Sequence, residues 1–276
     1  MRVNGLDVHV QRLGHHDEAP RPVVVLIHGL LIDSLASYYF SLAPQLAEEG
    51  LDVVMYDLRG HGRTSRPPTG YRMEDFVRDL DALLDTLAVD RPVHLVGNSF
   101  GGAVAYAMAA AHPERVASVI AIEAEPPART WAETMSEGLV GEGGGLVVQE
   151  VTQWLRENPG RRNERPFRAA GRVLDETALA QELPLSALLD EDLSAIRCPV
   201  FAIFGGASYL SAQTGMLEAS LADCRTVVLP DRGHSVLVEA TKDTYALVRD
   251  WLLGQKTQEA QRTQGTQGAH ALREAR

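Results

Sequence analysis

The sequence predicts an α/β fold, in which helices cover both faces of a mostly parallel β-sheet. Short apolar runs, typical of buried strands, alternate with stretches whose apolar residues recur at helical spacing. One such strand, at 93–98, breaks directly into a Gly-x-Ser-x-Gly motif and then into an alanine-rich helix. Strands and helices that alternate in this way favour a parallel sheet.

The individual elements follow from local patterns. The start of the chain, interrupted by Asn4-Gly5, is expected to form a hairpin over 3–10. The remaining expected elements are, in chain order, a strand at 22–28, a helix at 35–49, a strand at 52–57, a helix at 73–87, the strand at 93–98 with its helix at 103–111, strands at 116–123, 199–204 and 225–229, and a helix at 237–253.

Two segments interrupt this alternation. Residues 126–190 contain helical fragments (131–135, 147–155 and 167–174) and a glycine-rich joint at 141–145, but no strand pattern. They are expected to form a helical cap inserted into a core made of 1–125 and 191–254. Residues 255–276 are rich in Gln, Thr and Arg and lack apolar periodicity, which predicts a disordered tail.

Composition limits the classes of protein and partner. A chain of 276 residues with 45% hydrophobic content can bury one large core with a small appendage. It contains no apolar stretch of roughly 20 residues and no secretory pattern at its start, so a cytoplasmic protein is expected. The net charge of −11 disfavours nucleic acid and anionic membranes. Cys198 and Cys224 have no metal or redox spacing, and no cofactor is expected.

The Gly-x-Ser-x-Gly motif points to a nucleophile. A serine in a sharp strand-to-helix turn has a strained backbone, and Gly97 and Gly101 supply the space that such a turn requires. The helix that follows aims its N-terminal N–H groups at Ser99, where they favour negative charge.

Four motifs in a fixed order carry a family resemblance. His28-Gly29 follows the strand at 22–28, Asp-Leu-Arg-Gly-His-Gly-Arg-Thr at 57–64 follows the next strand, Gly-Asn-Ser-Phe-Gly-Gly occupies 97–102, and Gly233-His234 follows the last strand. Over nearly all of residues 1–254 the chain resembles the α/β-hydrolase superfamily. The resemblance implies an eight-stranded, mostly parallel sheet flanked by helices, with the cap inserted after the sixth strand.

The resemblance also implies roles for particular residues. Ser99 matches the nucleophile and His234 the catalytic base. The oxyanion hole would consist of the backbone N–H groups of Leu30 and Phe100. His28 and His61 are expected to shape the neighbouring loops.

The orienting carboxylate departs from the common pattern. Similar enzymes have an Asp after the strand that here ends near 204, but this chain has Ser208 there. The apolar strand at 116–123 instead ends in Glu123 and Glu125, and a charge at the end of a core strand needs a partner. Since haloalkane-dehalogenase-like members and some lipases of the superfamily take the acid from the end of the sixth strand, the resemblance implies Glu123 as the acid, with Glu125 as the alternative. If both merely face solvent, the site is a dyad or is not hydrolytic.

The expected ligand is a small molecule of medium size. Leu31, Tyr38, Trp131 and Trp154 are expected to contact it in a largely apolar pocket. An arginine-rich stretch of the cap could hold an acyl carrier or a coenzyme A thioester, although a solvated surface is the simpler interpretation. The sequence allows a monomer or a homodimer.

Two functions are open at this point. The first is a serine hydrolase that cleaves an ester, thioester or activated carbon–carbon bond through an acyl-enzyme, and Asn98 resembles the elbow of carbon–carbon-bond hydrolases. The second is a non-hydrolytic protein of the same fold, such as a cyclase or condensing enzyme of specialised metabolism or a small-molecule binding protein. Ser99 argues against epoxide hydrolases and dehalogenases, which need an Asp at the elbow.

Overall fold

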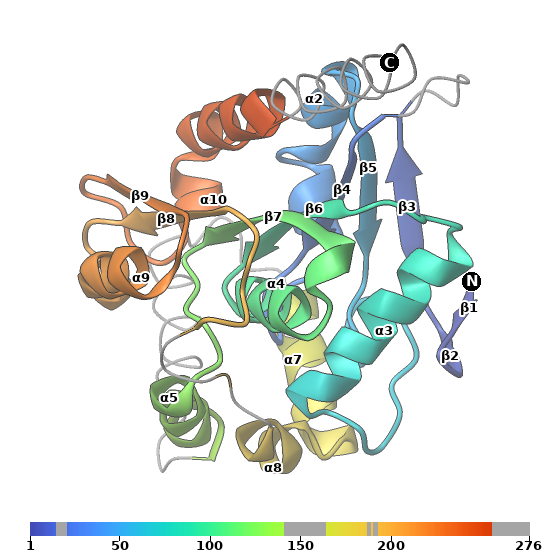
Figure 1. Ribbon diagram of the computed structural model, residues 1–276. Coiled ribbons are helices and arrows are strands. Elements are labelled where there is room, and N and C mark those ends of the chain that lie inside the picture. Colours follow the sequence, from blue (N-terminus) through green and yellow to red (C-terminus); the bar gives the residue numbers. More distant parts are fainter. Residues whose placement is uncertain (15–20, 141–163, 187–188, 190–192, 256–276) are drawn as a thin grey trace.

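The computed structural model describes residues 1–14, 21–140, 164–186, 189 and 193–255. In this part of the chain, seven strands form one sheet in the order β3-β5-β4-β6-β7-β8-β9 (Figure 1). Only β3 runs antiparallel to its neighbour. The strands are β3 (Val10–Leu13), β4 (Val23–Ile27), β5 (Asp52–Tyr56), β6 (Val93–Asn98), β7 (Val116–Ile122), β8 (Val200–Gly205) and β9 (Cys224–Leu229).

The predicted count of eight strands in the sheet is wrong for the described residues. The opening hairpin forms as expected, but as a separate two-stranded sheet of β1 (Arg2–Val3) and β2 (Leu6–Asp7). Asn4 and Gly5 both have positive φ and turn the chain back at once. The backbone groups of Met1 and Val8 then bond to each other, which leaves only β3 to join the large sheet.

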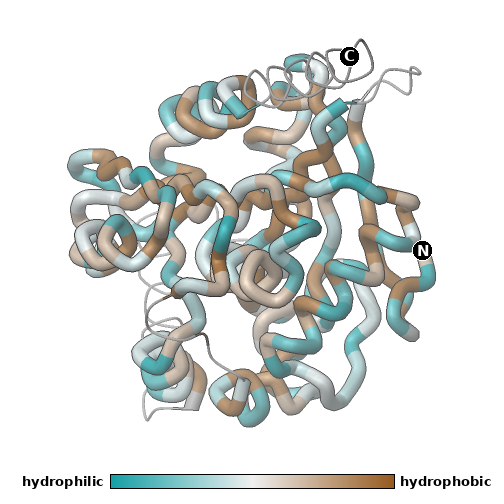
Figure 2. Tube along the Cα trace, in the orientation of Figure 1, coloured by the Kyte–Doolittle hydropathy of each residue, from teal (hydrophilic) through white to brown (hydrophobic). Residues whose placement is uncertain are grey.

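Helices cover both faces of the sheet, as the sequence predicts. Val24 and Leu26 pack on one face against α1 (Ala36–Tyr39), α2 (Ala43–Glu48) and a helix over 241–255. Val25 and Ile27 point to the other face, which α3 (Met73–Thr86) and α4 (Phe100–Ala111) cover. Figure 2 shows hydrophobic residues concentrated in the strands between these layers. Successive residues of the strand thus point alternately into two different cores, one on each face of the sheet.

Two predicted helices are each divided in the structure. The helix expected at 35–49 is split into α1 and α2, because the chain leaves helical geometry after Tyr39 and resumes with Pro44 in the first turn of α2. The helix expected at 237–253 is split into α10 (Val236–Glu239) and the helix over 241–255. The break is at Ala240, whose φ of −130° and ψ of 39° are not helical.

The described part of the insertion between β7 and β8 contains helices joined by turns and no strand. It contains α5 (Arg129–Val140), α7 (Glu164–Glu176), α8 (Leu179–Glu182) and the 3₁₀ helix η3 (Leu183–Leu185), and α5 packs against α8 and η3. The predicted joint at 141–145 and fragment at 147–155 lie outside the described residues, as does the tail from 256 onward. The division into core and cap stays a prediction.

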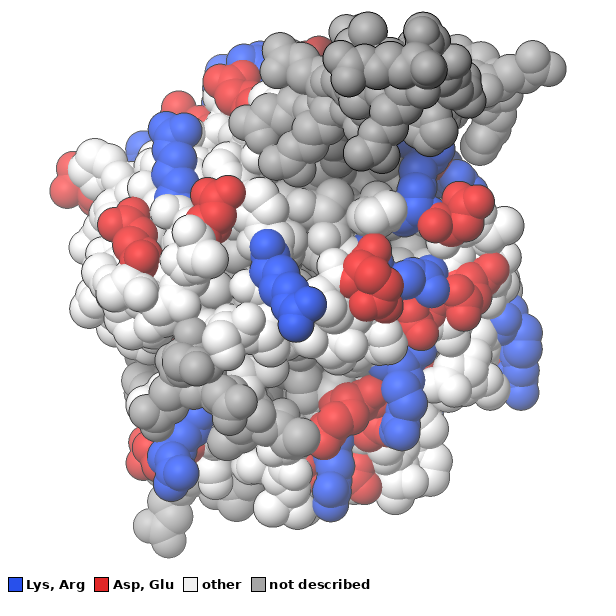
Figure 3. Space-filling model, in the orientation of Figure 1, with Lys and Arg blue, Asp and Glu red and all other residues white. Residues whose placement is uncertain are grey.

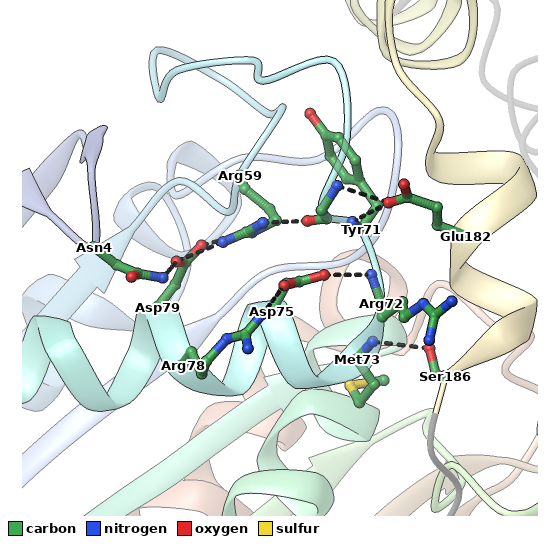
Figure 4. A network of polar contacts seen from close by, with 11 residues as sticks. Asn4, Arg59, Tyr71, Arg72, Met73, Asp75, Arg78, Asp79, Glu182 and Ser186 are labelled. Carbon is green, nitrogen blue, oxygen red and sulfur yellow. Dashed lines mark hydrogen bonds and ion pairs between the residues drawn. The ribbon is translucent and has the colours of Figure 1, made fainter.

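Side chains at the end of the insertion accept hydrogen bonds from backbone N–H groups of the core (Figure 4). The Glu182 carboxylate accepts the N–H groups of Gly70 and Tyr71 at 2.7 and 2.6 Å. Ser186 Oγ accepts the N–H of Met73, the first residue of α3, at 2.8 Å. A buried Arg59–Asp79 pair supports the same loop, because Arg59 also donates to the Gly70 carbonyl. The insertion is thus held against the loop before α3.

We expect Glu182→Ala to lower the free energy of unfolding by about 2 kcal/mol, because two partly buried N–H groups lose a charged acceptor. Urea denaturation measures this value. Glu176→Ala is the matched control, since Glu176 makes an exposed ion pair with Arg66 at 3.2 Å and should change stability by less than about 1 kcal/mol. Equal effects of the two substitutions would contradict this account of the anchoring.

Figure 3 shows acidic and basic side chains interspersed on the face that it presents. None of the helices in the described ranges is both long and apolar enough to cross a membrane.

Candidate active site

Ser99 occupies the turn between β6 and α4 in a strained conformation. Its φ of 52° and ψ of −122° lie in a region that residues other than glycine rarely adopt. Its N–H donates to the Ile122 carbonyl of β7 at 2.9 Å, and its own carbonyl accepts the N–H of Gly102 at 2.8 Å. The neighbouring strand and the helix together hold the turn, which is how the structure maintains the strain.

The glycines of the motif are required by close approaches of the backbone. A Cβ on Gly97 would collide with the Gly101 carbonyl across the turn. A Cβ on Gly101 would collide with the carbonyl groups of Ile27 and His28, at the end of β4. The tight turn therefore depends on glycine at both positions.

The structure brings Ser99, His234 and Glu123 together. His234 Nε2 lies 3.1 Å from Ser99 Oγ, and its Nδ1 lies 3.0 Å from Glu123 Oε2. The Glu123 side chain is completely buried, whereas 27% of the His234 side chain remains exposed. One imidazole thus connects an alcohol to a buried carboxylate, the arrangement of a catalytic triad.

Glu123 sits in a cradle of donors at the end of β7. Its φ of 50° ends the strand, and its N–H donates to the Ile203 carbonyl of β8 at 2.8 Å. Its carboxylate accepts the Gly205 N–H through Oε1 and the Ser208 hydroxyl, at 2.6 Å, through Oε2. With His234, three donors surround a carboxylate that water does not reach, which compensates for its burial.

Glu125 has a different environment. Its carboxylate accepts a hydrogen bond from the Gln213 side chain, and it makes no direct hydrogen bond to His234 in the described residues. Burial raises the pKa of Glu125, although the Gln213 hydrogen bond and the nearby His234 act in the opposite direction. Of the two carboxylates considered from the sequence, only Glu123 contacts the imidazole.

The residues expected to form the oxyanion hole lie in the loops beside Ser99. Phe100 is the first residue of α4, where helix N–H groups have no intrahelical acceptor. Leu30 lies in the loop after β4. Among the described residues, the N–H groups of Leu30 and Phe100 have no hydrogen-bond acceptor. Both are therefore available as donors.

Two buried histidines hold the loop that contains Leu30. His28 Nε2 accepts the N–H of Leu58 at 3.0 Å, which places the proton on Nδ1, facing the Gly29 carbonyl. His61 Nε2 accepts the N–H of Leu31 at 2.9 Å. Burial, with a smaller contribution from His28, lowers the pKa of His61 to about 3. It remains neutral and acts as an acceptor, so both rings shape the loops rather than move protons.

The structure places the predicted ligand-contacting residues in different surroundings. Tyr38 is completely buried in the core on the α2 side of the sheet, with its hydroxyl 3.3 Å from the Val96 carbonyl. Leu31 is buried beside the site loops. Trp131 of α5 stacks on Phe100 with ring centroids 6.4 Å apart, so the insertion reaches the elbow. Trp154 lies outside the described residues.

Sequence reasoning missed the groups that hold the two carboxylates. Gly205 ends β8, and Ser208 and Gln213 follow it; all three lie more than 80 positions from the carboxylates that they contact. A Gly-Gly-x-Ser sequence at the expected position of the acid was the only local signal. In the described part of the chain, no group of three His, Cys, Asp or Glu side chains is placed to hold a metal ion.

Comparisons with known proteins identify similar sequences and folds. A family model described as alpha/beta hydrolase fold matches residues 22–156. Proline iminopeptidase from Lactobacillus helveticus is 26% identical over 283 residues, covering 90% of this chain and 95% of that protein. Non-heme chloroperoxidase from Streptomyces lividans is 38% identical over 90 residues, and that match spans only 33% of this chain and 33% of the chloroperoxidase.

A solved structure supports the fold over most of the chain. The enol-lactonase from Burkholderia xenovorans LB400 has a TM-score of 0.69 to this structure at 24% identity, covering 92% of this chain and 99% of that one. The family model, the relatives and this structural likeness agree with the central parallel sheet and its flanking helices. The chain belongs to the α/β-hydrolase superfamily.

Proposed function

We propose that this protein is a serine hydrolase that cleaves an ester, a thioester or an activated carbon–carbon bond through an acyl-enzyme on Ser99. The observation that carries the proposal is His234, which lies within hydrogen-bonding distance of both Ser99 Oγ and Glu123 Oε2. An unassisted serine hydroxyl is a poor nucleophile, and a histidine base oriented by a carboxylate is the usual means of activating it.

In the first half of the reaction, Ser99 Oγ attacks the carbonyl carbon of the substrate while His234 Nε2 takes its proton. Nδ1–H donates to Glu123, so the carboxylate keeps the imidazole in the required tautomer and stabilises the imidazolium as it forms. The N–H groups of Leu30 and Phe100 receive the developing oxyanion, and the N-terminus of α4 favours its charge. His234 then donates the proton to the leaving group.

In the second half, water attacks the acyl-enzyme. His234 Nε2 takes a proton from the water, the oxyanion hole again holds the negative charge, and the proton returns to Ser99 Oγ as the acid product leaves. Both halves use the proposed triad and the two backbone donors. The cycle uses no cofactor.

The alternative, a non-hydrolytic protein of the same fold, rests on the absence of a carboxylate at position 208. The contact between Glu123 and His234 weakens that argument, because a carboxylate from β7 occupies the place next to the imidazole. The similarity to an iminopeptidase and an enol-lactonase also favours hydrolysis. We propose a largely apolar small molecule of medium size as the substrate, with Leu31 and Trp131 among its contacts.

A fluorophosphonate probe tests the proposal without knowledge of the substrate. We expect the probe to add its mass to the peptide that contains Ser99 in the folded protein, and not to label Ser99→Ala, which lacks the nucleophile. Hydrolysis of p-nitrophenyl esters of increasing acyl length then defines the substrate class. A folded protein that neither reacts with the probe nor hydrolyses any ester of the series would favour the non-hydrolytic alternative.

A further inference from the structure

The side chain of Ser208 contacts the buried carboxylate rather than solvent. We propose that Ser208 is a positioning residue for the triad, whose hydroxyl keeps the Glu123 carboxylate turned toward His234. The inference rests on the proposed function, since it concerns a residue that acts on catalysis through Glu123. Among the described residues, the Ser208 side chain forms hydrogen bonds with Glu123 and Leu210, and with neither Ser99 nor His234.

The position of the Ser208 hydroxyl is determined by the turn that begins there. Ser208 caps the 3₁₀ helix η4 (Tyr209–Gln213), and its Oγ accepts the N–H of Leu210 at 3.3 Å. The hydroxyl hydrogen is then free to point at Glu123 Oε2, 2.6 Å away. At the other end of the same turn, Gln213 donates to Glu125. The turn η4 is therefore tied to the end of β7 through two different carboxylates.

The contact matters because Glu123 has no access to water. Its Oε1 faces the Gly205 N–H, and its Oε2 is shared between the Ser208 hydroxyl and His234 Nδ1. Without the hydroxyl, Oε2 keeps a single donor, and no solvent molecule can replace the lost one at a side chain with 0% exposure. A buried carboxylate that loses a donor is left with an unsatisfied oxygen lone pair and is less firmly oriented.

Residues 205–208 also contact the loop that precedes His234. The Ala207 N–H donates to the Arg232 carbonyl at 2.8 Å. A Cβ on Gly205 would collide with the Arg232 and Gly233 carbonyl groups, directly before His234. Residues 205–208 therefore contact both the acid and the backbone that presents the base, and Ser208 supplies the only side-chain hydroxyl of that segment.

The test measures the rate of fluorophosphonate labelling of Ser99 from about pH 5 to about pH 9. We expect Ser208→Ala to react about tenfold more slowly near neutral pH, the size of effect that follows from losing one hydrogen bond to a charged group. The pH dependence of labelling should also change, because the carboxylate that faces His234 Nδ1 has lost one of its hydrogen-bond donors. Ser208→Thr should remain within about threefold of the wild type.

The matched control is Ser211→Ala. Ser211 lies in the same turn and donates to the Ser208 carbonyl at 2.8 Å, but it does not contact Glu123. Its loss weakens the turn alone, so labelling should stay near the wild-type rate. Thermal unfolding confirms that each variant is folded. If Ser208→Ala does not fold, Ser208→Cys keeps the size of the side chain but supplies only a weak donor, and the same loss is expected.

The outcomes separate this inference from the proposed function. If the wild-type protein is not labelled at all, the proposed function fails, and the role of Ser208 fails with it. If the wild type reacts and Ser208→Ala keeps both its rate and its pH profile, only the role of Ser208 is overturned. An equal loss in Ser211→Ala would likewise overturn it, since the effect would then come from the turn and not from the hydroxyl.

Discussion

Glu123→Gln is expected to slow hydrolysis and probe labelling by at least roughly 100-fold, with the fold retained. In a serine protease triad the corresponding Asp-to-Asn change costs about 10⁴-fold in kcat. The physical reason here lies in the donors around the side chain. With the Gln oxygen facing the Gly205 N–H, the amide NH₂ faces His234 Nδ1. That nitrogen must then accept, so the proton moves to Nε2 and His234 can no longer take a proton from Ser99.

Glu125→Gln is the matched control for this substitution. Glu125 lies two residues away, is also buried and also accepts a hydrogen bond, but from Gln213. A Gln at this position should leave the reaction within a few-fold of the wild type. A severe loss of activity in Glu125→Gln, together with nearly normal activity in Glu123→Gln, would identify Glu125 instead of Glu123 as the acid. Near-normal rates in both variants would remove β7 from the mechanism.

Gly101→Ala is expected to lower the free energy of unfolding by about 4 kcal/mol or more, because the added methyl group meets backbone and not a movable side chain. The Cβ would overlap the carbonyl groups of Ile27 and His28. Relief of that overlap would require α4 to move away from β4, and the Ser99 turn would move with it. Chemical denaturation measures the loss, and labelling of the folded fraction should fall as well.

Gly215→Ala separates this collision from the general effect of replacing glycine. Gly215 lies in α9 (Thr214–Ser220), and nothing lies within 4 Å of a Cβ placed there. Alanine at this position should leave stability unchanged or raise it by about 0.5–1 kcal/mol, because it restricts the unfolded chain and favours the helix. If Gly101→Ala were equally harmless, close packing at the elbow would not explain why glycine occupies position 101.

Ser99 and its surroundings illustrate what can be read from local sequence. The strand before Ser99, the glycines around it and the helix after it are contiguous in the chain, so their pattern predicts the turn directly. The buried strands could also be predicted from local sequence. Alternate residues of β4 pack into opposite cores, so every residue of the strand is apolar. Tyr38 shows the limit of such patterns: helical spacing does not reveal whether a helix faces a pocket or the sheet, and Tyr38 of α1 packs in the core beside the sheet.

By itself, then, the sequence determined the α/β class, the strained serine turn and the order of the motifs that follow the strands. Only the tertiary structure decided which carboxylate meets His234. Glu123 and Glu125 look alike in the chain, and their partners at 205, 208, 213 and 234 lie on other elements. The positive φ of Glu123 and the register of β7 with β8 turn it toward His234. Such pairing depends on contacts between distant segments, which no local periodicity encodes.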